Sequence, residues 1–175
     1  MDDKEIEEIY NQTFPGLAFF SRDTNLSESL IERYYVGQIL LERGFTDMTF
    51  KRGGLTSSTR YLIASANGRD VSSIVPEAEL FGLVILKRSS HFKVLDIHRH
   101  KHKVQILLLE IPGNALDFFS RTKSNIEEKV IKMAREDFDK KWNAEPIAEL
   151  QSKEWVERTA FPIGMNDSGD FFLTD

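Results

Sequence analysis

The sequence predicts an α+β fold: a mainly antiparallel five-stranded sheet in the middle of the chain, flanked by N-terminal and C-terminal helices. Apolar residues recur at helical spacing towards both ends, and between them the spacing changes to two. Of the 175 residues 41% are hydrophobic and 13 are Phe, enough for a packed core. We expect one domain over 1–175, with helical parts at 1–45 and 113–160, a sheet at 46–112 and an acidic tail at 161–175.

Two helices are expected before the sheet. Residues 3–11 form a short amphipathic pattern, which ends at Pro15-Gly16. A second helix is predicted over 26–43, because Asn25 can cap it and Gly44 follows its last turn. Its apolar residues recur at helical spacing, so one face should be buried.

Five strands are predicted at 48–52, 60–66, 80–88, 92–97 and 104–111. The last run, VQILLLEI, is apolar on both faces, as in a central strand. A single strand over 92–111 would be about 66 Å long at about 3.3 Å per residue, whereas a chain of this length folds to a radius of gyration of about 16 Å. The chain must therefore turn within 98–103, on a hairpin loop of four to five residues.

Helices return after Pro112-Gly113. Ser124 and Glu127 form a capping box before a helix over 125–142, and 147–158 suggests another short helix. The tail residues Phe171, Phe172 and Leu173 form either a docked last strand or an exposed hook. The predicted core comprises Leu30, Tyr34, Leu41, Leu83, Ile85, Ile106, Leu108, Val130, Ala134 and Phe138.

Charge is unevenly distributed along the chain. Residues 1–50 carry 4 basic and 10 acidic side chains, residues 51–103 carry 10 and 4, and the remainder carries 9 and 14. No cysteine occurs, which excludes disulfides, thiolate metal ligands and a cysteine nucleophile. The acidic N-terminus does not resemble a signal peptide and the longest apolar run is too short to span a bilayer, so we expect a soluble cytoplasmic protein without membrane contact.

The basic middle of the chain predicts a binding surface on the sheet. We expect a non-catalytic binding or protein–protein interaction module, whose partner is an acidic protein or another anionic ligand. The candidate binding residues are Arg60, Lys87, Arg88, Lys93, Arg99, Lys101 and Lys103.

The stretch HRHKH at 98–102 raises the alternative of a metal site. Imidazoles two residues apart on a strand share a face, so His98, His100 and His102 are the candidate metal ligands. Arg99 and Lys101 would repel a cation there, and zinc sites usually draw ligands from separate rigid elements. We therefore expect a solvated basic turn, with no metal and no cofactor.

Two other functions remain as alternatives. Nucleic-acid binding would use the basic segment, but no known nucleic-acid-binding signature occurs. A metal-dependent nuclease would need an acid followed by an acid-x-lysine element, and Asp96 and Glu110 lack the lysine. The pair Glu77 and Glu79 fits a solvated loop as well as a catalytic pair, and common catalytic motifs are missing, so an enzyme is not the favoured interpretation.

Overall fold

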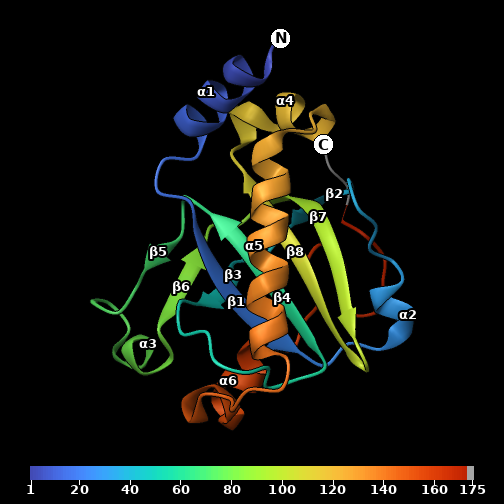
Figure 1. Ribbon diagram of the computed structural model, residues 1–175. Helices are drawn as coiled ribbons and strands as arrows, with labels where there is room; N and C mark the ends of the chain where they lie inside the picture. The colour runs from blue at the N-terminus through green and yellow to red at the C-terminus, as the bar shows by residue number, and fades with distance from the viewer. Residues whose placement is uncertain (173–175) are drawn as a thin grey trace.

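The computed structural model describes residues 1–172 of the chain (Figure 1). Its α-helices are α1 (Asp3–Thr13), α2 (Glu28–Ile31), α3 (Pro76–Phe81), α4 (Leu116–Arg121), α5 (Asn125–Lys141) and α6 (Lys153–Arg158), with 3₁₀ helices η1 (Gly113–Ala115) and η2 (Ala148–Gln151). Its strands are β1 (Ala18–Thr24), β2 (Ile39–Glu42), β3 (Thr46–Thr49), β4 (Thr59–Ser65), β5 (Arg69–Asp70), β6 (Leu83–Leu86), β7 (Ser90–His100) and β8 (Lys103–Ile111).

All eight strands belong to one sheet, in the order β2-β7-β8-β4-β1-β3-β6-β5. Every neighbouring pair is antiparallel except β4 and β8, which run parallel. The α+β class and the mainly antiparallel sheet are therefore confirmed. The expected number of five strands is wrong, because β1 and β2 lie in the part predicted to be helical and β5 is a two-residue edge strand.

The connection between β2 and β3 shows that the sheet is strongly rolled. These strands stand first and sixth in the strand order, so in a flat sheet they would lie about 24 Å apart at about 4.8 Å per step. Only residues 43–45 separate Glu42 from Thr46, and four Cα steps of about 3.8 Å reach at most about 15 Å. The sheet must curl until β2 approaches β3, which encloses a concave face.

Each face of the sheet carries its own hydrophobic core. On the convex face α1, α4 and α5 cover residues such as Leu62 and Leu107, and Figure 1 shows α5 running across it. The concave face holds Tyr61, Ile106 and Phe92, and is covered by α2 and by residues 159–172, hereafter the C-terminal segment. In Figure 1 this red segment passes behind the sheet, on the side away from α5.

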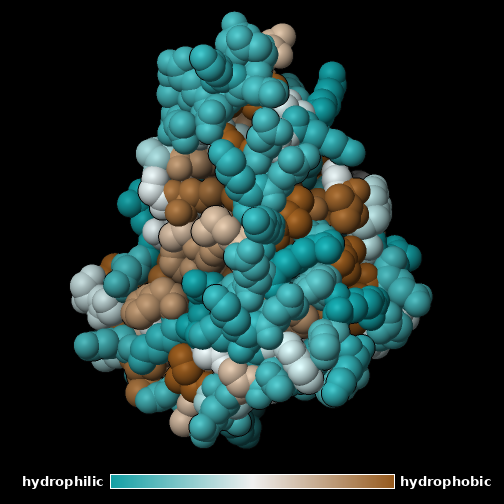
Figure 2. All heavy atoms as spheres, in the orientation of Figure 1, coloured by the Kyte–Doolittle hydropathy of each residue, from teal (hydrophilic) through white to brown (hydrophobic). Residues whose placement is uncertain are grey.

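The outward side of α5 faces solvent. Figure 2 shows a hydrophilic band down the middle of this view, where Figure 1 places α5, with hydrophobic side chains on either side. The inward stripe of this helix includes Val130, Ala134 and Phe138, which are at most 7% exposed. The predicted helix at 125–142 is thus confirmed. Among residues 1–172 no helix combines the length and apolar character required to cross a bilayer.

The prediction of a helix over 26–43 is wrong. Only α2 is helical there, Gly37 adopts a left-handed φ of 89°, and β2 follows. Leu40 and Leu41 are both buried although adjacent, because strand side chains alternate between two covered faces. A short apolar run of this kind satisfies helical and strand spacing alike, so local pattern could not separate them.

The turn expected within 98–103 is confirmed, but it is shorter than predicted. His100 pairs with Lys103, so only Lys101 and His102 connect β7 to β8, and Lys101 has a φ of 53°. The expected core is largely confirmed. Leu30 and Ile85 are half-buried, and the buried members are Tyr34, Leu41, Leu83, Ile106, Leu108, Val130, Ala134 and Phe138.

Candidate functional site

Arg22 is a buried arginine on the concave face. It lies on β1 opposite Tyr61 of β4, and only 6% of it is exposed. Its Nη1 donates to the carbonyl of Asp47 at 3.4 Å and its Nη2 to the carbonyl of Phe161 at 2.8 Å. Within residues 1–172 its Nε has no hydrogen-bond partner and no carboxylate lies within 4.0 Å of the guanidinium.

This environment is unfavourable for a cation. Desolvation lowers the pKa of the Arg22 guanidinium, although the charges of Asp47 and Glu42 act in the opposite direction. Buried charges in proteins are normally paired, and a carbonyl oxygen supplies only part of that compensation. An anion placed against Arg22 would offset this desolvation cost.

A pocket of about 320 Å³ opens beside Arg22. A second cation lines it, since Arg158 of α6 contributes a guanidinium whose Nη1 lies 3.3 Å from Oδ2 of Asp47. Three phenyl rings also line it. The complete lining is Arg22, Glu42, Gly44, Phe45, Arg158, Phe161, Pro162, Met165, Asn166, Asp167 and Phe172. Cations and flat rings together suit a ligand with phosphate groups and an aromatic base.

Glu42 is a carboxylate at the wall of the same pocket. Its Oε1 accepts from the backbone N–H of Gly44 at 3.0 Å and its Oε2 from that of Gly164 at 2.8 Å. Two backbone donors hold the carboxylate in one orientation at the end of β2. Its negative charge can stabilise positive charge that develops on a ligand in the pocket.

The C-terminal segment forms one wall of the pocket and closes the gap left by the rolled sheet. It binds β1 through Thr159, whose hydroxyl donates to the Asp23 carbonyl at 3.3 Å. It binds the centre of the concave face through Ile163, and β2 through the Gly164–Glu42 contact. The tail therefore docks through these contacts and through Phe171, which contacts the aromatic ring of Tyr34. Leu173 lies outside the described residues.

Two of the basic residues predicted for a binding surface are buried in ion pairs. Arg60 makes a two-pronged contact with Asp23 at 2.7 and 2.8 Å. The Nζ of Lys93 donates to Oε1 of Glu127 at 3.0 Å and to two backbone carbonyls. Burial raises the pKa of the Glu127 carboxyl, and the contact with Lys93 opposes that shift.

The other predicted basic residues lie at two places, in the β6–β7 turn and in or beside the β7–β8 turn. Lys87 and Arg88 lie between β6 and β7, where Arg88 stands over the ring of Phe45. Arg99 pairs with Glu28 at 2.6 Å. Lys101 stands over the ring of Trp142. The Nζ of Lys103 donates to the backbone carbonyl of Trp142 at 2.8 Å. The structure does not bring the seven residues to one place, and anion binding by the exposed ones stays a prediction.

His98 and His100 of the β7–β8 hairpin contact α5 and the residue that follows it. His98 lies 3.0 Å from Oδ1 of Asp139, and the ring of His100 stacks on Trp142 with centroids 4.0 Å apart. His102 is exposed in the turn. Over the described part of the chain, no three His, Asp or Glu side chains converge in a way that could hold a metal ion.

The carboxylates considered for catalysis lie apart from the Arg22 pocket. Asp96 accepts two hydrogen bonds from Arg135, at 2.7 and 2.8 Å. Glu77 and Glu79 are exposed on α3. Glu110 lines a different cavity.

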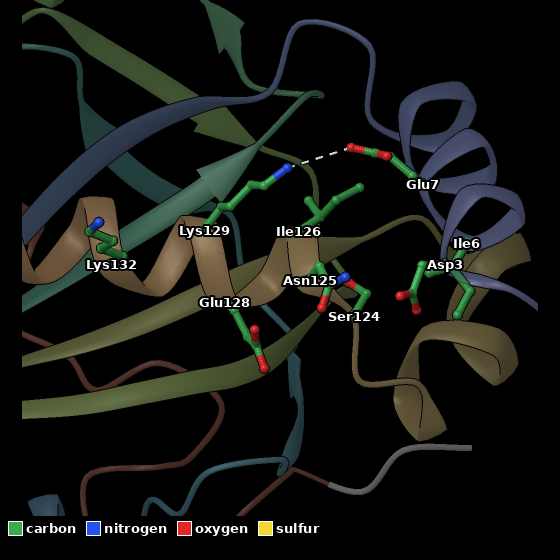
Figure 3. A pocket seen from close by; sticks show the side chains of 9 residues that line it. All are labelled: Asp3, Ile6, Glu7, Ser124, Asn125, Ile126, Glu128, Lys129 and Lys132. Carbon is green, nitrogen blue, oxygen red and sulfur yellow. Dashed lines mark ion pairs between the residues drawn. The ribbon is translucent and has the colours of Figure 1, made fainter.

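A further groove lies between α1 and the start of α5 (Figure 3). Its lining is mixed, with Ile6 and Ile126 beside charged residues, and Lys129 lies 3.6 Å from Glu7 across it. Figure 3 shows these side chains coming from two neighbouring helices. Among residues 1–172 no buried polar group lines this groove, so nothing there would orient a reactive ligand.

Comparison with solved structures finds similar folds among bacterial effectors and toxins. XopAI, a type III effector from Xanthomonas axonopodis pv. citri, matches with a TM-score of 0.48 and 14% identity, over 57% of this chain and 46% of that one. The ADP-ribosyltransferase HopU1 of Pseudomonas syringae pv. Tomato DC3000 matches with a TM-score of 0.47 and 18% identity, over 54% and 46%. Exoenzyme S from Pseudomonas aeruginosa, bound to carba-NAD and human 14-3-3 protein beta, matches with a TM-score of 0.49 and 14% identity, over 73% and 64%.

This chain therefore spans about half the length of XopAI and HopU1. Neither a protein-family model nor a curated protein matches its sequence. At TM-scores below 0.5 these similarities supply no correspondence between residues.

The comparison corrects the expected function. Similar folds that include ADP-ribosyltransferases contradict the prediction of a non-catalytic binding or protein–protein interaction module. They also contradict the preference against an enzyme. That preference rested on missing motifs, and an active site assembled from distant strands and loops leaves no contiguous motif.

Sequence analysis did not identify Arg22 as a site residue. The available signal was a charged side chain two residues after Phe20, just beyond the apolar run 17–20. That signal requires the segment to be assigned as a strand, since only then does Arg22 share a face with Phe20.

Proposed function

We propose that this protein is an enzyme that holds the phosphates of a nucleotide substrate against Arg22 and transfers a group from that nucleotide. One observation carries the proposal: Arg22 is a buried guanidinium without a carboxylate partner among residues 1–172, and it lines a pocket. A volume of about 320 Å³ is at the lower end of small-molecule sites, about 300–1,000 Å³.

The particular reaction proposed is ADP-ribosyl transfer, the activity named for HopU1, and the proposed donor is NAD. NAD carries a diphosphate for Arg22 and Arg158 and a flat cationic ring for the phenyl groups of the pocket. The pocket would accommodate the nicotinamide end of NAD, with the adenosine end extending outwards.

The chemistry assigns a role to Glu42. When the bond between ribose C1′ and the nicotinamide nitrogen breaks, its electron pair neutralises the pyridinium and positive charge develops on the ribose. A carboxylate held by two backbone donors can stabilise that charge. The acceptor then forms a new bond to C1′ with its own electron pair and releases its proton to solvent.

Calorimetric titration with NAD and with ADP-ribose tests the proposal. We expect both to bind, and Arg22→Met to weaken both by about tenfold or more, because a charge-assisted hydrogen bond is lost. Arg158→Met, at a partly exposed side chain, should weaken them less. Arg121→Met, at an exposed position of α4 away from the pocket, is the matched control.

Release of nicotinamide from NAD tests the reaction itself. Glu42→Gln should leave binding within about threefold and reduce the rate by about 10²-fold or more, since the charge on ribose develops only in the transition state. Failure of both nucleotides to bind the folded wild-type protein would refute the proposal. The cytoplasmic location and the single domain expected from sequence are likewise proposed.

A further inference from the structure

A second cavity, of about 470 Å³, lies where the ends of several strands meet. Asn67 and Arg69 line it after β4 and on β5, and Glu110 lines it from β8. The turn between β6 and β7 forms another wall. The remaining lining residues are Leu86, Lys87, Ser89, Ser90, His91, Ile111, Pro112, Gly113 and Asn114.

Glu110 is a buried carboxylate held by neutral donors. It is 4% exposed, and its Oε2 accepts from Asn67 Nδ2 at 2.9 Å and from Ser65 Oγ at 3.3 Å. Within residues 1–172 no cation lies within 4.0 Å of it. A buried carboxylate without a cationic partner is costly unless a ligand supplies one.

The two oxygens of Glu110 differ. Oε2 has both lone pairs engaged, whereas Oε1 accepts no hydrogen bond from the described residues. Oε1 is also not among the fully enclosed polar atoms that lack a partner, so it remains accessible from the cavity. One accessible oxygen is suited to a point-like donor such as an ammonium group, whereas a guanidinium fork needs both oxygens.

The rim of the cavity has the opposite charge. Lys87 and Arg69 are exposed, line the cavity and make no ion pair with the part of the chain that the structure describes. The turn that carries Lys87 is held by Ser90, whose Oγ donates to the Lys87 carbonyl at 2.7 Å, and by Ser89 in a left-handed conformation with φ 60°. Two cations therefore stand at the mouth above a buried anion.

We propose that this cavity binds a small zwitterion, with a primary ammonium group on Glu110 and a phosphate or carboxylate group at Lys87 and Arg69. This site is separate from the Arg22 pocket, and the inference does not rest on the proposed enzymatic activity. A metal ion fits poorly here, because no three carboxylate or imidazole ligands converge within residues 1–172. A purely anionic ligand would leave Glu110 without a partner, and a purely cationic one would face the basic rim.

Titration with phosphoethanolamine, ethanolamine and inorganic phosphate separates the two ends of the site. We expect phosphoethanolamine to bind more tightly than either half alone. Glu110→Gln should weaken both amines by about tenfold. Lys87→Ala should weaken phosphoethanolamine by about two- to fivefold and leave ethanolamine unchanged, because only the anionic group reaches the exposed lysine. Glu77→Gln, at an exposed carboxylate on α3, should alter neither.

A second measurement does not depend on the fold of a variant. The side-chain amide of Asn67 donates to Glu110, so its NMR resonances in the wild-type protein should shift when ethanolamine is added and stay unchanged with inorganic phosphate. Equal binding of phosphoethanolamine by folded Glu110→Gln, or Asn67 resonances that do not respond to ethanolamine, would overturn the proposal. Neither result would bear on NAD binding at Arg22.

Discussion

The phenol oxygens of Tyr34 and Tyr61 lie 2.6 Å apart in the core of the concave face. The hydroxyl of Tyr34 donates to the carbonyl of Ile163 at 2.6 Å, and the backbone N–H of Ile163 donates to the hydroxyl of Tyr61 at 3.1 Å. If Tyr61 donates to Tyr34, each hydroxyl gives one hydrogen bond and accepts one. This ring of hydrogen bonds connects Tyr34, which follows α2, with Tyr61 of β4 and Ile163 of the C-terminal segment. It therefore fixes the segment that forms one wall of the Arg22 pocket.

Loss of the Tyr61 hydroxyl should loosen that wall. Tyr61→Phe leaves the N–H of Ile163 buried without its acceptor, so we expect the free energy of unfolding to fall by about 1–3 kcal/mol. Urea denaturation measures this change. Tyr35→Phe, at a residue 63% exposed, is the control and should change it by less than about 0.5 kcal/mol. Equal effects of the two variants would argue against the ring.

Alkaline pH should destabilise the protein through the same ring. Burial raises the pKa of Tyr61 from 10.0 to about 12 and also raises that of Tyr34. Between pH 10 and 12 an unfolded chain loses these protons while the folded chain retains them, so stability falls as pH rises. Thermal unfolding between pH 8 and 11.5 measures the effect. Its slope above pH 10 should be smaller in Tyr34→Phe, and an unchanged slope would contradict the assignment.

The buried pair of Arg60 and Asp23 should matter far more than the exposed pair of Arg99 and Glu28. The first side chains are 1% and 5% exposed, the second 47% and 59%. Arg60→Met leaves an unpaired buried carboxylate and should cost about 3–5 kcal/mol of unfolding free energy. Arg99→Met should cost about 0–1 kcal/mol. Denaturant titration of both variants checks the ranking, and comparable losses would refute it.

Gly54 should not tolerate a side chain. A Cβ at this position would collide with the backbone carbonyl of Ala144, just after α5, and the N–H of Gly54 donates to the carbonyl of Glu145 at 3.0 Å. Gly54→Ala should therefore destabilise the protein by about 1–3 kcal/mol. Gly113→Ala meets no heavy atom within 4 Å and should be nearly neutral. Calorimetric melting temperatures distinguish the two, and an equally stable Gly54→Ala would show that the loop moves away.

Sequence analysis succeeded where the spacing of apolar residues along a segment agrees with the way that segment is buried in the fold. The helix α5 carries its own cap at Ser124 and its own apolar stripe, and β7 and β8 are joined by a turn that chain length alone requires. It failed at β1 and β2, which pair with strands distant in sequence. Residues 18–24 form a strand because they pair with β4. Residues 39–42 form a strand because they pair with β7, next to the hydrogen bond from Gly37 to the Val94 carbonyl. Neither partner strand can be identified from a single window of sequence.

The candidate site likewise depends more on long-range packing than on local sequence pattern. Residue spacing and composition were sufficient to predict the α+β class, a mainly antiparallel sheet, the helix α5 and the lack of cysteine. They did not reveal which charges are buried: Arg60 and Lys93 pair with carboxylates, whereas Arg22 donates to the carbonyl of Phe161, 139 residues away. The desolvation of a side chain depends on all the groups packed around it, and long-range strand pairing rather than adjacent sequence brings those groups together.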